Sequence, residues 1–247
     1  MKEKSKVKSK GKKKEKNKAK IFYRLGLLTV LGLAVIVGIY LSFFTAPPAP
    51  PTAEKYNSRG LHKYEVGNYN GAIKEYTRAI QTDPRDKVSY FGRANAYIQI
   101  YLYQKALADY DKAIQLDPTN PVYHANRANA NYGLENYKAT LADYDRAIKL
   151  NPQDGKLYQR RALLKEKNFK AGQKELAADW RKAIALGVED EHIFISYGSY
   201  LNNDLQNYEA ALNCFQKALK VNPNSGLAKQ NRDITLENIR TKKANQI

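Results

Sequence analysis

A proline returns every 34 residues along the middle of this chain of 247 residues, at Pro84, Pro118 and Pro152. Each proline follows a run of apolar residues at helical spacing, and the positions between the prolines repeat as well. A fixed period of this size indicates stacked copies of one small structural unit. One such unit is too small to bury its own apolar face, so the copies must share a continuous core. The period therefore predicts an open stack and argues against a single closed core.

The residues that recur in each copy are small or aromatic. A small residue comes first, then two alanine positions with one bulky aromatic residue between them. The small positions are Gly60, Ala94, Ala128, Ala162 and Gly198, and the aromatic positions are Tyr76, Tyr110, Tyr144, Trp180 and Phe215. Each copy has two helical runs joined by a polar turn, and the proline ends the second run. The chain is thus predicted to be all-α.

This pattern of small, alanine, aromatic, alanine and proline positions resembles the tetratricopeptide repeat. The resemblance implies an α-solenoid of about five helix-turn-helix repeats within 53–223, with a concave groove lined by the first helix of each repeat. The fourth copy has extra residues before Trp180, and the fifth has one extra near Asn202. The predicted repeats are 53–86, 87–120, 121–154, 155–190 and 191–224, and 225–247 is predicted to be a capping helix.

Four arginines stand at the same place in successive copies, and an acidic residue follows each of them. The acid comes sixteen residues later in the first three copies and eighteen residues later in the fourth. The fifth copy lacks both partners, since Tyr197 and Cys214 replace them. We therefore predict structural ion pairs between the two helices of a repeat, and the alternative is a row of cations for an anionic ligand. The predicted pairs are Arg59 with Glu75, Arg93 with Asp109, Arg127 with Asp143, and Arg161 with Asp179.

The N-terminal region has the composition of a membrane anchor. Residues 25–44 contain no charged side chain, and a helix of that length spans about 30 Å. A transmembrane helix is predicted over 21–44 and a Pro-rich linker over 45–52, although a cleaved signal peptide is the alternative. The basic tail 1–20 holds 11 lysines and is predicted to be disordered and cytoplasmic. The repeats of this single-pass membrane protein would then be extracytoplasmic, in a periplasm or lumen.

The resemblance also implies where a ligand would bind. Relatives hold peptides against the first helices, and on this chain the corresponding residues are Tyr64, Phe91, Asn95, Asn126, Asn129, Tyr132, Lys156 and Arg160. Some relatives grip the carboxylates at a peptide's C-terminus with Lys, Asn, Asn, Lys and Arg. Four of these places match, at Asn95, Asn126, Lys156 and Arg160, while Phe91 stands where the first lysine would be.

Charge and composition exclude several other classes of function. The net charge is +18, but half of it lies in the basic tail, so nucleic-acid binding is not predicted. The single cysteine and three scattered histidines have no metal-ligand spacing, and no phosphate-binding or nucleophile motif is present. No enzyme activity, no metal and no cofactor are predicted.

We therefore expect a membrane-anchored scaffold that binds a protein or peptide in assembly of a membrane or envelope complex. The alternative is a polyanion- or envelope-binding structural protein that uses the basic fourth repeat, where 156–182 hold 9 basic and 3 acidic residues. A homo-oligomer is a third possibility.

Overall fold

The chain divides after residue 50 into two units, and each is described here by itself. The computed structural model describes residues 32–37, 51–169 and 171–245. In the first unit, residues 32–37 are helical. The predicted tail 1–20, the remainder of the predicted transmembrane helix and linker residues 45–50 lie outside the described residues. Among the residues that are described, no helix combines the length and the apolar character needed to cross a bilayer.

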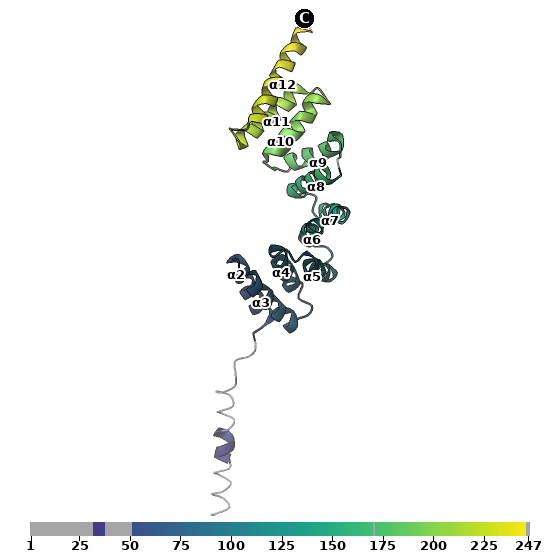
Figure 1. Cartoon of the computed structure of the whole chain (residues 1–247). Helices are drawn as coiled ribbons and strands as arrows, with labels where there is room; N and C mark the ends of the chain where they lie inside the picture. Colours follow the sequence, from purple (N-terminus) through teal and green to yellow (C-terminus); the bar gives the residue numbers. More distant parts are fainter. Residues whose placement is uncertain (1–31, 38–50, 170, 246–247) are drawn as a thin grey trace, which may run out of the picture. The chain divides into compact units, whose positions relative to one another are not determined.

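The second unit consists of helices joined by short turns, and its described residues contain no strand. The helices pair as first and second members of successive repeats (Figure 1). They are α2 Ala53–Glu65, α3 Tyr69–Thr82, α4 Lys87–Gln99, α5 Tyr103–Leu116, α6 Pro121–Gly133, α7 Tyr137–Leu150, α8 Gly155–Asn168, α9 Gln173–Ala185, α10 Glu191–Asn203, α11 Tyr208–Val221 and α12 Gly226–Ala244. Each predicted repeat range thus holds two helices, and α12 lies within the predicted cap.

The first helix of each middle repeat starts at a polar cap. The side-chain oxygens of Asp86, Asn120 and Asp154 each accept a hydrogen bond of 3.0 Å from the backbone N–H two residues later. These residues satisfy N–H groups that have no partner within the helix. Since the caps are 34 residues apart and each follows a proline, the chain ends one helix and begins the next at the same point of every copy.

The core consists of alanines between large aromatic rings. Ala94, Ala128 and Ala162 are fully buried, so neighbouring helices approach closely at these positions. Tyr76 shows how one ring serves two repeats. A methyl group added at Gly60 of its own repeat would lie 2.8 Å from the Tyr76 ring, and one added at Gly92 of the next repeat would lie 2.5 Å away. The recurring small and aromatic positions therefore hold repeats to each other as well as helices within a repeat.

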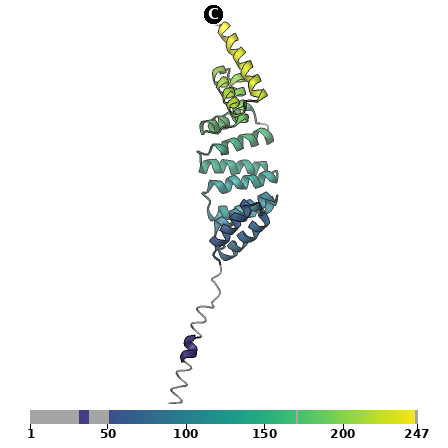
Figure 2. The same cartoon turned by 90° about the vertical axis from the view of Figure 1, so that its left-hand side faces the viewer.

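Helices adjacent in sequence pack against each other from α2 to α12, and α4 also contacts α2 and α6. The first helices α4 and α6 lie to the left of the second helices α5 and α7 in Figure 1, and Figure 2 shows the helices as successive layers. The first helices α2, α4 and α6 thus contact one another in a row along one side of the stack, and α8 is the next first helix in sequence. This row is the surface on which the predicted ligand-binding residues lie.

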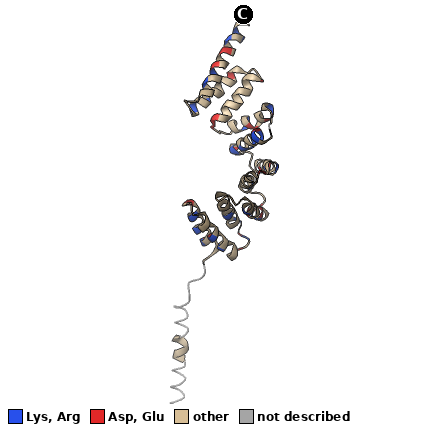
Figure 3. Cartoon of the chain, in the orientation of Figure 1, with Lys and Arg blue, Asp and Glu red and all other residues tan. Residues whose placement is uncertain are grey.

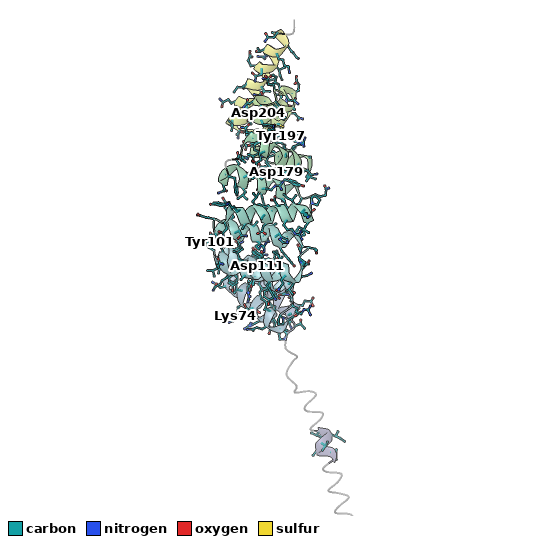
Figure 4. The ribbon with its side chains drawn as sticks, turned by 90° about the vertical axis from the view of Figure 1, so that its right-hand side faces the viewer. Lys74, Tyr101, Asp111, Asp179, Tyr197 and Asp204 are labelled. Carbon is teal, nitrogen blue, oxygen red and sulfur yellow. The ribbon has the colours of Figure 1, made fainter. Side chains whose placement is uncertain are left out.

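The turns inside the repeats need a left-handed residue. Gly67 fills this position in the first repeat with φ of 76°, and Tyr101, Glu135 and Gln206 fill it in the second, third and fifth repeats with φ of 61°, 59° and 50°. A bulky residue is strained in this region. Tyr101 is nevertheless 77% exposed, and Figure 4 shows it at the edge of the array.

Candidate functional site

Two asparagines connect the first helices at the middle of the groove. The Asn126 amide on α6 donates to the Asn95 side-chain oxygen on α4 at 3.2 Å. The Tyr110 hydroxyl donates to the same oxygen at 2.6 Å. The Asn95 oxygen is therefore already in use, while the Asn95 amino group and the Asn126 side-chain oxygen make no other hydrogen bond among the described residues. These two groups can pair with the backbone of an extended peptide.

A cavity of about 220 Å³ lies between the third and fourth repeats, and we call it the basic cavity. It contains three of the predicted site residues, Asn129, Tyr132 and Arg160. The other lining residues are Tyr144, Leu163, Leu164 and Lys167. Sequence reasoning missed Lys167, which lies seven residues after Arg160 and therefore on the same face of α8. The cavity combines an apolar floor with two cations.

The two cations of the basic cavity have no acidic partner. Arg160 and Lys167 are exposed, and no carboxylate of the described residues lies within 4.0 Å of either. Burial raises the pKa of the Tyr144 hydroxyl, while the Arg160 charge acts in the opposite direction. Figure 3 shows Lys and Arg gathered on α8 and α9. The cavity is thus neutral at its floor and positive at its rim.

A second cavity, of about 600 Å³, lies between the first and second repeats, and we call it the acidic cavity. Its apolar lining includes Leu61, Val88 and the predicted site residue Phe91. Glu54, Asp83 and Asp86 stand around that lining, together with Asn57 and Asn95. The opposite ends of the groove therefore carry opposite charges.

The carboxylate of Asp86 is held in place by its neighbours. It accepts hydrogen bonds of 2.5 Å from Ser89 and of 2.5 Å from Asn57. Burial disfavours the charge of this carboxylate, but the hydrogen bonds from Ser89, Asn57 and the Val88 N–H outweigh it and lower the Asp86 pKa. Asp86 is consequently a fixed negative charge that also caps α4.

The structure does not bring all of the predicted residues together. Lys156 lies in a separate cavity with Asp154, Glu189 and Asp190, away from the one that holds Arg160. Tyr64 lies against Tyr69 with 5.5 Å between ring centroids, and its hydroxyl accepts a hydrogen bond from Gln99 at 3.2 Å. Of the four residues that match the carboxylate-gripping pattern, Asn95 and Asn126 are joined by a hydrogen bond of 3.2 Å.

Three of the recurring arginines each join three helices. Arg93 Nε lies 2.7 Å from Asp109, Arg127 Nη2 lies 2.6 Å from Asp143, and Arg161 Nε lies 3.0 Å from Asp179. Each arginine also donates to the second helix of the preceding repeat. These second acceptors are Thr77 at 3.1 Å, Asp111 at 2.7 Å and Asp145 at 2.6 Å.

We call these three groups the arginine clamps. Asp111 and Asp179 of the clamps are labelled in Figure 4, which views the array from the side of the second helices. The second acceptors stand sixteen residues before each arginine, and sequence reasoning missed them. Their 34-residue spacing, at 77, 111 and 145, could have revealed them.

The first repeat departs from the predicted pairing. Glu75 pairs with Lys63 at 2.7 Å and with Arg78 at 3.1 Å, not with Arg59. The Arg59 guanidinium lies 5.9 Å from the centre of the Tyr56 ring. Among the residues that the structure describes, no repeat precedes this one, so Arg59 lacks the second acceptor that the clamps use. The hydrogen bond from Lys63 lowers the pKa of Glu75 despite its burial.

Comparison with known proteins assigns the repeats. Residues 103–135 match a model described as TPR repeat, and residues 195–225 match one described as tetratricopeptide repeat. The second unit is an all-α solenoid of tetratricopeptide repeats. None of the curated proteins matches the chain.

Several solved structures share the fold. The MamA protein is similar with a TM-score of 0.57 and 23% identity, over 68% of this chain and 90% of MamA. YrrB, described as a TPR protein with an unusual peptide-binding site, has a TM-score of 0.56 and 20% identity over 73% of this chain and 92% of its own. A thermophilic TPR protein of Thermus thermophilus, TTC0263, has a TM-score of 0.50 and 18% identity over 75% of this chain and 99% of its own. At these identities the likeness shows the fold alone.

Proposed function

We propose that this chain is a membrane-tethered scaffold whose groove binds an extended peptide segment of a partner protein. The observation that carries the proposal is the basic cavity, in which Arg160 and Lys167, with no acidic partner among the described residues, lie beside Tyr132 and Leu163. Unpaired cations beside exposed aromatic surface suit a partner that supplies acidic and apolar side chains. The peptide-binding site named for YrrB supports a groove of this kind.

The groove would act by supplying a prearranged surface. The Asn95–Asn126 hydrogen bond fixes two amides that can meet a peptide backbone. Phe91 packs against Tyr123 with 4.9 Å between ring centroids, so its ring is already held in place before a ligand arrives. Such preorganisation reduces the entropy lost on binding. The proposed role is binding, and no catalytic step forms part of it.

The membrane tether rests on the sequence. The uncharged stretch 25–44 and the lysines of 1–20 support a single span with a cytoplasmic N-terminus, and the scaffold would then serve a membrane or envelope complex. Protease added to intact cells, followed by detection of residues 224–247, tests this topology. Digestion without lysis would support extracytoplasmic repeats, whereas protection until lysis would place them in the cytoplasm.

A polyanion is the second candidate ligand, because the exposed cations Arg160, Lys167, Lys174 and Arg181 share the fourth repeat. A polyanion held by these charges would be released steeply as salt rises. A peptide held partly by Tyr132 and Leu163 would be less sensitive to salt. Binding of heparin and of a selected peptide, each measured across a range of salt concentrations, separates the two candidates.

Panning of the full-length chain against a random peptide library tests the groove. We expect enriched peptides to bind about tenfold more weakly to an Arg160→Ala, Tyr132→Ala variant, because truncation of central contact residues removes roughly 1–2 kcal/mol or more. Lys74→Ala is the matched control, since Lys74 is an exposed cation on α3, labelled in Figure 4 on the side of the second helices. Failure to enrich any peptide that distinguishes these variants would overturn the proposal.

A further inference from the structure

The two cavities of the groove differ in charge, and no described residue of opposite charge neutralises either of them. In the basic cavity, Arg160 and Lys167 lack carboxylate partners among the described residues. In the acidic cavity, no Lys or Arg side-chain nitrogen of the described residues lies within 4.0 Å of Glu54, Asp83 or Asp86. Uncompensated charge of both signs in one groove favours a ligand that carries both signs in the opposite order.

The nearest cation to the acidic cavity is directed elsewhere. Lys87 starts α4 beside Asp86, but its ammonium group pairs with Asp117 of the following loop at 2.7 Å. That hydrogen bond raises the Lys87 pKa and keeps the ammonium charged. Glu54 and Asp83 are exposed, and Asp86 is held as a carboxylate by Ser89 and Asn57. The negative end of the groove is therefore available to a ligand.

The groove between the two ends is uncharged. It presents Asn126 of α6, whose amide donates to Asn95 of the acidic cavity at 3.2 Å. Amides suit a peptide backbone, so this stretch imposes no charge of its own. Charge selection is thus confined to the two cavities.

The distance between the cavities sets the length of the ligand. The first helices α4 and α8 are separated by α6, and packed helix axes lie about 8–10 Å apart, so the ends are roughly 20 Å apart. An extended chain covers that distance in about six residues at ~3.3 Å each.

From these features we propose that the groove selects dipolar segments, with acidic side chains in the basic cavity and a Lys or Arg beside an aliphatic or aromatic side chain in the acidic cavity. The inference rests on the proposed peptide-binding function. It adds the order of the charges along the ligand and the number of residues between them. It also assigns the acid recognition to side-chain carboxylates beside Arg160 and Lys167.

The test uses fluorescein-labelled peptides that are acetylated and amidated, so that no terminal charge remains. One peptide carries a pair of glutamates at one end and leucine with a pair of lysines at the other, separated by about six neutral residues. Both chain directions are synthesised, and the comparison peptide has glutamates at both ends. Fluorescence anisotropy with the full-length chain should show one dipolar peptide binding at least about tenfold more tightly than the doubly acidic one.

Charge reversal identifies the two ends. Arg160→Glu with Lys167→Glu should weaken the dipolar peptide about tenfold and strengthen a peptide whose glutamates are replaced by lysines. Glu54→Lys with Asp83→Lys should weaken the dipolar peptide to a similar extent and strengthen the doubly acidic one. Lys74→Glu is the control and should change neither. Asp86 is left intact because it caps α4.

Equal binding of the dipolar and doubly acidic peptides would overturn the inference, as would a requirement for a free C-terminal carboxylate. Binding of panned library peptides that is insensitive to both charge reversals would also overturn it, yet would leave the proposed peptide groove standing. Absence of any peptide that binds, whether synthetic or panned, would overturn both. Binding that is insensitive to both charge reversals therefore distinguishes failure of the proposed charge order from failure of the proposed peptide groove.

Discussion

The second to fourth repeats and the fifth repeat solve the same packing problem in different ways. Each of the former is fastened by an arginine clamp, in which one guanidinium reaches the second helices of its own and of the preceding repeat. In the fifth repeat the arginine becomes Tyr197, which lies against Tyr200 with 6.5 Å between ring centroids. The buried Cys214 stands where the acid of a clamp would be. Arg181, sixteen residues before Tyr197, stands where the second acceptor would be.

The arginine and the acid of a clamp depend on each other. A buried carboxylate without its cation is strongly unfavourable, so loss of the arginine requires loss of the acid. Burial raises the pKa of both the Tyr197 hydroxyl and the Cys214 thiol, which keeps these two groups neutral. At this position of the repeat, an ion pair joins the helices in the middle of the array, and aromatic packing replaces it in the fifth repeat.

The largest effect should follow from breaking a clamp. Arg127→Ala leaves Asp143, which is 3% exposed, without its cation, and we expect the array to lose about 3 kcal/mol of stability. Urea denaturation followed by circular dichroism measures the loss. Arg146→Ala, at an exposed position of α7, is the control and should stay within about 0.5 kcal/mol of the wild type. Equal midpoints for the two variants would contradict the structural role of the clamp.

Building half a clamp in the fifth repeat should be the next largest perturbation. Tyr197→Arg removes the contact with Tyr200 and sets a cation near Arg181 with no acid to receive it, so we expect a loss of about 2 kcal/mol. Addition of Cys214→Asp should restore at least half of this loss, since it supplies the missing partner. Thermal denaturation of the single and double variants forms a cycle, and purely additive effects would rule out the pairing.

Alkaline pH should lower the stability of the N-terminal repeats more than that of the C-terminal ones. Burial raises the pKa of Tyr76 to about 12 from an ordinary 10.0. Between these values the unfolded chain ionises while the folded chain stays neutral, so this contribution to stability is complete below pH 10 and falls as pH rises toward 12. Trp180 and Phe215, at the equivalent positions, do not ionise.

Tyr76→Phe should therefore leave stability at pH 7 within about 0.5 kcal/mol and recover roughly 2 kcal/mol near pH 12. Denaturation midpoints measured at both pH values check the sign. A variant that is equally sensitive to alkali would show that another group carries the effect.

The smallest effect should come from relieving strain in a turn. Tyr101, with φ of 61°, occupies the turn position that Gly67 fills in the first repeat. Tyr101→Gly places a glycine there. We expect a gain of up to about 1 kcal/mol, reduced by the lost edge contact with Tyr103. Differential scanning calorimetry measures it. Destabilisation by this change would mean that the exposed ring stabilises the turn more than its backbone strains it.

The sequence predicted the features that repeat, and it failed where the ends of the array break the repetition. The period, the turns and the sixteen-residue pairing of Arg93 with Asp109 could be found because each copy faces the same neighbours. Arg59 was paired wrongly with Glu75, because Lys63 and Arg78 take that carboxylate, and spacing alone does not reveal such competing cations. The fold is thus readable from local pattern, since its contacts lie within a repeat or between adjacent repeats.

The candidate site was predicted less completely, because the polar groups left free in a cavity depend on which side chains hydrogen-bond to each other. Asn95 was expected to be free for a ligand, yet its oxygen receives Tyr110 and Asn126. Lys156, four residues before Arg160 on α8, lines a different cavity together with the loop that contains Asp190. Lys167 was overlooked although its seven-residue spacing from Arg160 places both on one face of α8.

The most direct test of the account is to locate a bound peptide on the full-length chain. A photoreactive benzophenone side chain would replace Tyr132 in the groove or, in a second protein, Lys74 on the side of the second helices. Illumination with a panned peptide should give a crosslink from position 132 and none from position 74. Crosslinks from position 74 that equal or exceed those from position 132 would contradict a ligand held in the groove.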